Sequence, residues 1–260
     1  MELGYKGERV LITGSTKGIG YACAEAFAAE GCPVIITGRD AATVEAARQK
    51  LASAYQVKVE AFAGDLSHPA ERERLAAQAP DIDILVNNAG AIPGGSLLDL
   101  SMQTWDQAWA LKVMGYIHLT QIYLRRMKDK RAGTIVNIIG SGGRSPRFDY
   151  VCGGTGNAAL MAFTGAVGGH SVDFGVRVFA INPSSTKTDR AITLAKTRAK
   201  AKYGDESRWE EMQHHAPLGR LAEPGEMARA AVFLASPACG YVSGATLDID
   251  AGSAYRGGPV

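Results

Sequence analysis

The sequence predicts an α/β fold, a doubly wound, seven-stranded parallel sheet with helices on both faces. Short apolar runs of strand length alternate with longer amphipathic stretches along the chain. Runs such as VLI and ILV are apolar throughout, which is typical of strands buried on both faces. At 260 residues and 46% hydrophobic content, the chain is long enough to form one substantial core.

The apolar runs and the amphipathic stretches give the expected elements in order. We place the strands at Arg9 to Thr13, Pro33 to Thr37, Val57 to Ala61, Ile84 to Asn87, Thr134 to Ile139, Val176 to Asn182 and Ala245 to Ile249. We place the helices at Ile19 to Glu30, Ala41 to Tyr55, Ala70 to Gln78, Thr104 to Lys128, Gly156 to Phe174 and Pro224 to Leu234. Such alternation predicts parallel strands joined by right-handed helical crossovers.

The chain is expected to form a single domain over residues 1–260. It contains no internal repeat, low-complexity tract or linker that would mark a boundary. The longest irregular stretch, from Ser184 to Leu221, is therefore interpreted as a substrate lid.

Charge and composition exclude several functional classes. A net charge of +2 is too mild for a nucleic-acid or membrane-surface partner. The four cysteines are far apart, so we expect neither a metal site nor a disulfide framework. The N-terminus has no signal-peptide pattern, and no apolar run is long enough to span a membrane. We expect a soluble, cytoplasmic protein.

A glycine-rich turn follows the first strand and opens the first helix. Gly14 permits a tight turn, Gly18 lets the backbone approach a pyrophosphate, and Gly20 lets the helix pack closely on the strand. The helix N-terminus would then hold the diphosphate. This strand, turn and helix predict a Rossmann-like nucleotide site.

The end of the second strand favours NADP(H) over NAD(H). An acid here would accept from the ribose 2′-hydroxyl and repel a 2′-phosphate. The sequence has Gly38 at that position, followed by Arg39, and Lys17 adds a cation in the glycine loop. Both cations suit a 2′-phosphate, although Lys17 also fits an exposed surface charge.

The spacing TGxxxGxG resembles that of the short-chain dehydrogenase/reductase family, and further landmarks follow in order. They are Asp65 in GDL, the NNAG run at Asn87 to Gly90, Asn182-Pro183-Ser184 with Thr188, PLGR at Pro217 to Arg220, and the closing Val242 to Gly252 segment. Ser184 departs from the usual glycine. The resemblance, together with the glycine loop and Arg39, implies a cofactor site formed by Gly14, Ser15, Thr16, Lys17, Gly18, Ile19, Gly20, Arg39, Asp65, Leu66, Asn88, Ala89, Gly90, Asn157, Pro183, Ser184, Thr186 and Thr188.

The family resemblance also locates four catalytic positions, and this chain departs from the tyrosine, lysine and asparagine positions, while the serine position has two candidates. The flanking AAL and Phe-Thr residues put Asn157 at the lysine position and Gly153 at the tyrosine position, so the YxxxK motif is absent. Lys112 occupies the asparagine position, and the serine position falls on Gly140, or on Ser141 after a one-residue shift.

Asparagine and lysine are thus exchanged between two positions that meet in one proton relay in the family. One hypothesis is that Lys112 places its ammonium in the active site while Asn157 supplies ribose or relay hydrogen bonds. The alternative is drift in a pocket that no longer needs them.

Two residues could replace the missing hydroxyl. Tyr150 could enter the cleft, where Lys112 would lower the pKa of its phenol, or it could pack against the lid. Ser141 could donate to a substrate carbonyl. The run from Gly153 to Gly156 is too glycine-rich for an ordinary helix interior and indicates close backbone approach or room for a ligand.

The lid is basic and ends near two histidines. Its cations are Lys187, Arg190, Lys196, Arg198, Lys200 and Lys202. They fit a solvated helix face, or attraction for an anionic substrate such as an acyl-CoA thioester or a carboxylate. His214 and His215 are interpreted as surface residues.

Three functions are compatible with these features. The favoured one is an NADP(H)-dependent oxidoreductase acting on a carbonyl/alcohol pair of a small molecule with a non-standard acid/base group. The alternatives are an NADPH-binding sensor or scaffold without redox turnover, and a non-redox lyase or isomerase that uses Lys112 as a base. The family resemblance implies a homotetramer.

Overall fold

The computed structural model describes residues 1–213 and 216–255 and confirms the predicted fold class. Its seven strands form one parallel sheet in the order β3-β2-β1-β4-β5-β6-β7. The strands are β1 (Val10–Ile12), β2 (Val34–Gly38), β3 (Val59–Ala63), β4 (Ile84–Asn87), β5 (Gly133–Ile138), β6 (Val176–Pro183) and β7 (Thr246–Ile249). The strand order reverses between β1 and β4, and sheets of this kind bind ligands at that point.

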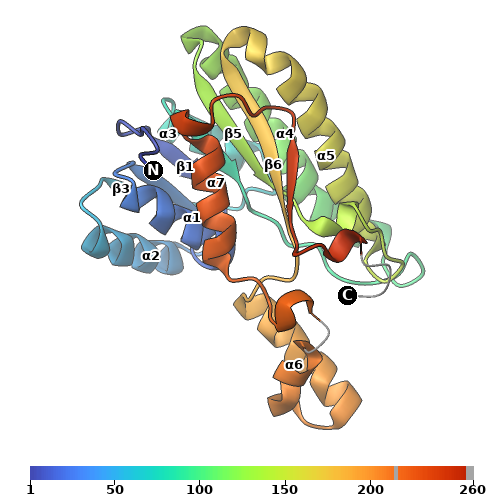
Figure 1. Cartoon of the computed structure of the whole chain (residues 1–260). Coiled ribbons are helices and arrows are strands. Elements are labelled where there is room, and N and C mark those ends of the chain that lie inside the picture. Colours follow the sequence, from blue (N-terminus) through green and yellow to red (C-terminus); the bar gives the residue numbers. More distant parts are fainter. Residues whose placement is uncertain (214–215, 256–260) are drawn as a thin grey trace.

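Helices cover both faces of the sheet (Figure 1). They are α1 (Gly18–Ala29), α2 (Ala41–Ala54), α3 (Pro69–Gln78), α4 (Met102–Lys130), α5 (Val151–Ser171), α6 (Asp189–Tyr203) and α7 (Pro224–Ala235). One core cluster packs α1, α2 and α7 on the sheet, and a second packs α3 and α4 on the opposite face. A third joins α4 to α5 beside β5 and β6.

Local signals explain where several helices begin. The Asp40 side chain accepts from Thr43 N at 2.8 Å and caps α2. Ser101 Oγ accepts from Thr104 N at 3.2 Å and caps α4. Pro224 opens α7, where Glu223 and Glu226 form a reciprocal capping box.

Two sequence-based boundaries were wrong in an informative way. Helix α5 begins at Val151, so the run from Gly153 to Gly156 is helical. Its low helix propensity is overcome by close packing, since a Cβ at Gly156 would lie 3.1 Å from Val113 of α4. Strand β3 begins at Val59, two residues later than expected.

The stretch expected to be irregular, from Ser184 to Leu221, contains α6. This helix extends away from the body of the domain (Figure 1). Lys196, Lys200 and Lys202 are exposed on it, as a solvated helix face would require. His214 and His215 lie outside the described residues.

Two expected absences can be examined over residues 1–213 and 216–255. No helix in these ranges combines the length and the apolarity that crossing a membrane requires. No cluster of three or more histidine, cysteine, aspartate or glutamate side chains suited to a metal ion occurs among them.

Candidate active site

A cleft of about 630 Å³ lies at the carboxyl ends of the central strands. It crosses the strand-order reversal between β1 and β4 and reaches from the end of β2 to the end of β6. Its lining residues are Gly14, Thr16, Lys17, Gly18, Ile19, Thr37, Gly38, Arg39, Gly64, Leu66, Asn88, Ala89, Gly90, Ala91, Leu111, Lys112, Ile138, Ile139, Gly140, Pro183, Ser184 and Thr188.

The glycine loop after β1 is locked to the segment after β4. Gly14 and Gly18 have φ values of 62° and 59°, a region that favours glycine. Gly20 is held against its neighbours, because a Cβ there would collide with Gly14 O and Asn88 Nδ2. Asn88 Nδ2 in turn donates to Thr13 O and Gly14 O, both at 3.0 Å. The loop therefore has one defined shape facing the cleft.

Ser15 is buried beneath the glycine loop, where it stabilises the loop, and it does not line the cleft. Its buried hydroxyl donates to Ile12 O at 2.7 Å and accepts from Thr37 N at 2.9 Å. Ser15 therefore ties the loop to β2, which carries Gly38 and Arg39 at its end.

Arg39 and Lys17 are both exposed at the β2 end of the cleft. Gly38 has no room for a side chain, since a Cβ would lie 2.7 Å from Thr16 Cγ2. The nearby carboxylate of Asp40 is used to cap α2, with Thr43 Oγ1 donating to it at 2.6 Å. The segment after β2 thus presents the Arg39 cation, while the Asp40 carboxylate beside it is hydrogen-bonded to the first turn of α2.

Asp65 lies beside this region, although it is not among the lining residues. Its carboxylate accepts from Ser67 N at 2.9 Å. Burial raises its pKa, but the hydrogen bonds from Ser67 and the nearby charges of His68 and Arg39 outweigh this and lower the pKa overall. The side chain is therefore an anion that accepts hydrogen bonds, next to lining residues Gly64 and Leu66.

The segment after β6 closes the other side of the cleft. Pro183, Ser184 and Thr188 line it, whereas Thr186 is buried and donates to Ser184 O at 3.0 Å. Thr188 caps α6 by accepting from Ala191 N, and its methyl would lie 3.2 Å from a Cβ at Gly18.

Lys112 extends from α4 into the cleft at the carboxyl end of β5. Its Nζ donates to Ile139 O at 2.7 Å and to Ile138 O at 3.1 Å. Its stem crosses Gly90, where a Cβ would lie 2.5 Å from Lys112 Cδ. Tyr116 also donates to Ile138 O, at 2.8 Å, and burial raises the pKa of its phenol, which keeps it a neutral donor. The position of the ammonium is fixed by this backbone.

The ring of Tyr150 occupies the space that a side chain at Gly153 would need. A Cβ at Gly153 would collide with ring atoms of Tyr150 and lie 2.5 Å from its hydroxyl oxygen. The ring also packs on an apolar cluster that contains Ile92, Ala108 and Cys152, none of which belongs to the lid. The Tyr150 ring thus packs against the first turn of α5, at Gly153, which precedes Asn157 by one helical turn.

Asn157 and Gly140 form a second pair of the same kind. Asn157 is 4% exposed, and its Nδ2 would lie 3.0 Å from a Cβ at Gly140. Gly140 itself has φ 140°, which favours glycine, and its N–H donates to Asn182 Oδ1 at 3.2 Å. Ser141 begins a short 3₁₀ helix, η1 (Ser141–Gly143), and is not part of the cleft lining.

The structure therefore brings most expected site residues to one cleft, but seven of them do not line it, namely Ser15, Gly20, Asp65, Ser141, Tyr150, Asn157 and Thr186. Ser15 and Thr186 are buried supports, and Ser141, Tyr150 and Asn157 lie around Gly140 and Gly153, off the lining. Six lining residues escaped the sequence analysis, namely Thr37, Gly64, Ala91, Leu111, Ile138 and Ile139. Most of these six residues are next in sequence to residues that the motifs identified. Their position near the ends of strands was the signal that could have placed them in the cleft.

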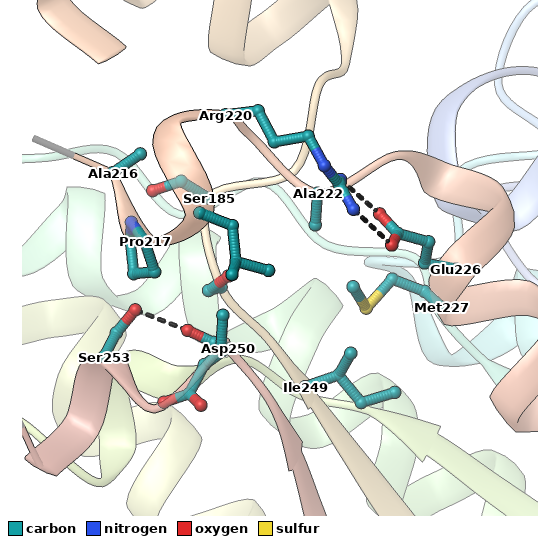
Figure 2. Close-up of a pocket in the computed structure, with 13 residues that line it drawn as sticks. Ser185, Ala216, Pro217, Arg220, Ala222, Glu226, Met227, Ile249, Asp250 and Ser253 are labelled. Carbon is teal, nitrogen blue, oxygen red and sulfur yellow. Dashed lines mark hydrogen bonds and ion pairs between the residues drawn. The ribbon is translucent and has the colours of Figure 1, made fainter. Parts of the chain in front are cut away.

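A smaller cavity of about 80 Å³ lies on the other side of Ser184, under the segment that precedes α7 (Figure 2). Several of its polar residues pair with one another. Arg220 Nη1 and Nη2 donate to the two carboxylate oxygens of Glu226 at 2.7 and 2.8 Å, and Ser253 donates to Asp250 O at 2.6 Å. Its size and internal pairing leave the larger cleft as the candidate active site.

Comparison with known proteins identifies the family. A family model described as Enoyl-(Acyl carrier protein) reductase matches residues 14–254. The chain belongs to the short-chain dehydrogenase/reductase family. The 3-oxoacyl-(acyl-carrier-protein) reductase of Aquifex aeolicus is 32% identical over 256 residues, which cover 97% of this chain and 99% of that relative.

Two further relatives show the range of activities in this family. Galactitol 2-dehydrogenase (L-tagatose-forming) of Cereibacter sphaeroides is 33% identical over 93% of this chain and 92% of that protein. The structure of L-sorbose reductase from Gluconobacter frateurii, complexed with NADPH and L-sorbose, superposes with a TM-score of 0.91 at 29% identity. It covers 96% of this chain and 98% of that one. The fold and the oxidoreductase class are thus shared with these relatives.

Proposed function

We propose that this short-chain dehydrogenase/reductase binds NADP(H) and interconverts a carbonyl and an alcohol group of a small molecule, with Lys112 and Tyr150 as its acid/base group. The observation that carries the proposal is the position of the Lys112 ammonium. It lies in the same cleft as the glycine loop and Arg39, at the end of β5. A cation there can stabilise negative charge that develops on a substrate oxygen.

The residues present fit NADP(H). The glycine loop faces the cleft with exposed backbone, Arg39 and Lys17 suit a 2′-phosphate, and no carboxylate projects from β2 to repel it. The L-sorbose reductase relative is complexed with NADPH, and a 3-oxoacyl-(acyl-carrier-protein) reductase from Agrobacterium tumefaciens, 28% identical, has NADP bound. When bound, the nicotinamide supplies hydride transfer to or from the reacting carbon.

The protein's own task is to orient the substrate and to move a proton. In the reducing direction, the Lys112 ammonium or the Tyr150 hydroxyl gives its proton to the substrate oxygen as the carbonyl π bond breaks. In the oxidising direction the same group accepts the hydroxyl proton. Asn88, Pro183 and Ser184 shape the cleft wall around the reacting groups.

This function is tested by following nicotinamide absorbance with a panel of named substrates. We would use acetoacetyl-CoA, L-sorbose and L-tagatose with NADPH, and galactitol and 3-hydroxybutyrate with NADP⁺. We expect turnover of at least one of these compounds. The variants Lys112→Met and Tyr150→Phe are each expected to lower kcat by about 100-fold or more, the range for loss of a general acid.

Matched controls are available on the same chain. Lys128→Met removes a lysine from the last turn of α4, and Tyr241→Phe removes a fully exposed phenol hydroxyl. Both should keep wild-type kcat. NADPH binding without turnover of any compound would contradict the oxidoreductase proposal, and full activity in both site variants would contradict the assigned acid/base group.

The remaining features of the protein are proposed on the same basis. We propose a homotetrameric, cytoplasmic enzyme whose residues 184–221 form a lid over the cleft, and whose exposed α6 lysines attract an anionic substrate. Light scattering of the purified chain tests the tetramer. A salt-dependent KM for acetoacetyl-CoA, absent for L-sorbose, would support the attraction of anions.

A further inference from the structure

The side-chain amide of Asn157 has no hydrogen-bond partner among the residues that the structure describes, and its carbonyl oxygen is fully buried. The residue is 4% exposed, and its Oδ1 is fully buried and unpaired within residues 1–213 and 216–255. Its Nδ2 likewise donates to none of the residues described. Burying an unpaired amide is costly, so a group of this kind needs an explanation such as a ligand.

Two glycines of the segment after β5 lie beside the amide nitrogen. It faces Gly140 and Gly142, where added Cβ atoms would lie 3.0 and 3.6 Å from its Nδ2. Gly140 lines the cleft and follows Ile139, whose carbonyl oxygen accepts a hydrogen bond from Lys112 Nζ. Gly140 therefore adjoins both the amide and the cleft that holds the ammonium.

The backbone at Gly140 is held in place for this arrangement. Its N–H donates to Asn182 Oδ1, and Asn182 Nδ2 donates to Asp248 Oδ1 at 2.7 Å. The φ of 140° at Gly140 and the nearby amide both disfavour a side chain there. The space beside Gly140, one of the two candidate serine positions, is thus occupied by an amide from α5.

We propose that the Asn157 amide N–H donates a hydrogen bond to the reacting oxygen of the substrate, in place of a serine hydroxyl at Gly140. This inference rests on the proposed function. It assigns Asn157 to the substrate rather than to the cofactor ribose, and it removes the need for Ser141 as the carbonyl donor. An amide donor with no acceptor among the described residues, fixed beside Gly140, is preorganised for charge that develops on an oxygen.

Two substitutions test this role, with one control. Asn157→Leu keeps most of the volume and removes both polar atoms. Asn157→Asp keeps the shape and removes the donor. The control Gln107→Glu makes the same amide-to-carboxylate change at an exposed position on α4. Each protein is assayed with the substrate panel above, and its dissociation constant for NADPH and its melting temperature are measured.

If the proposal is right, both Asn157 variants lose about 100- to 1,000-fold in kcat, as removal of an oxyanion donor does, and bind NADPH as the wild type does. Asn157→Leu should melt at or above the wild-type temperature, because the amide has no protein partner to lose. Gln107→Glu should resemble the wild type in all three measurements.

Other results would overturn the inference. Wild-type kcat in Asn157→Leu removes the amide from the reaction. Weaker NADPH binding with kcat preserved assigns it to the cofactor. A lower melting temperature with a matching loss of activity assigns it a structural role. The proposed function fails separately, if the wild-type protein turns over none of the panel compounds.

Discussion

The contact between Tyr150 and Gly153 gives a quantitative prediction about stability. In Gly153→Ala, the new Cβ would collide with the Tyr150 ring and lie 2.5 Å from its hydroxyl oxygen, so the ring must leave its apolar cluster. Overpacking of this kind costs about 1–3 kcal/mol. Alanine recovers about 1 kcal/mol of helix propensity relative to glycine. The net result is a loss of about 0–2 kcal/mol.

Removing the ring should reverse the sign. In a Tyr150→Ser background the space beside Gly153 is open, so Gly153→Ala should stabilise the chain by about 1 kcal/mol. The two backgrounds therefore differ by about 1–3 kcal/mol, a coupling energy that a double-mutant cycle measures. Urea unfolding followed by tryptophan fluorescence suits the test, because Trp105 and Trp109 pack on the same cluster. Equal effects of Gly153→Ala on the free energy of unfolding in both backgrounds would show that the Tyr150 ring does not lie against Gly153.

Three further predictions concern the cofactor, pH and thiol reactivity. Arg39→Ala should weaken NADPH binding by about 10- to 100-fold, the worth of a charged hydrogen bond, without affecting NADH; equal losses for both would contradict its assignment. Arg220 holds the pKa of Glu226 down at about 2, so Glu226→Gln should lower the melting temperature at pH 7. That difference should shrink as pH falls from the ordinary glutamate pKa of about 4.5 through 2, and a difference that does not change with pH would contradict the assignment. Burial raises the pKa of the Cys23 thiol to about 12, so iodoacetamide should label the partly exposed Cys239 before Cys23 in the native protein. Mass spectrometry follows the labelling, and early labelling of Cys23 would contradict its burial.

The shape of the glycine-loop side of the cleft could be predicted from sequence because its signals are local. Gly14 and Gly18 adopt positive φ values that few other residues tolerate, so their spacing after a strand carries the loop geometry with it. Arg39 follows β2 directly, so the end of that strand fixes its place. Such features depend on a few neighbouring residues.

The catalytic side depended on packing between distant segments. The Tyr150 ring fills the space beside Gly153, and the Asn157 amide fills the space beside Gly140. Both contacts result from the way residues 140–150 fold against α5. The start of α5 was missed for the same reason, since glycine propensity argued against a helix that tertiary contacts support. Only the position of Lys112, in the first half of α4 and facing the end of β5, could be anticipated, from its family position.

The most direct test of the account is the kcat of Lys112→Met measured beside wild type and Lys128→Met, with NADPH and each carbonyl of the panel. The account predicts that wild type and Lys128→Met turn over at least one compound at equal rates, while Lys112→Met binds NADPH equally well and loses about 100-fold or more in kcat. Undiminished kcat in Lys112→Met, with NADPH consumed at the wild-type rate, would contradict it.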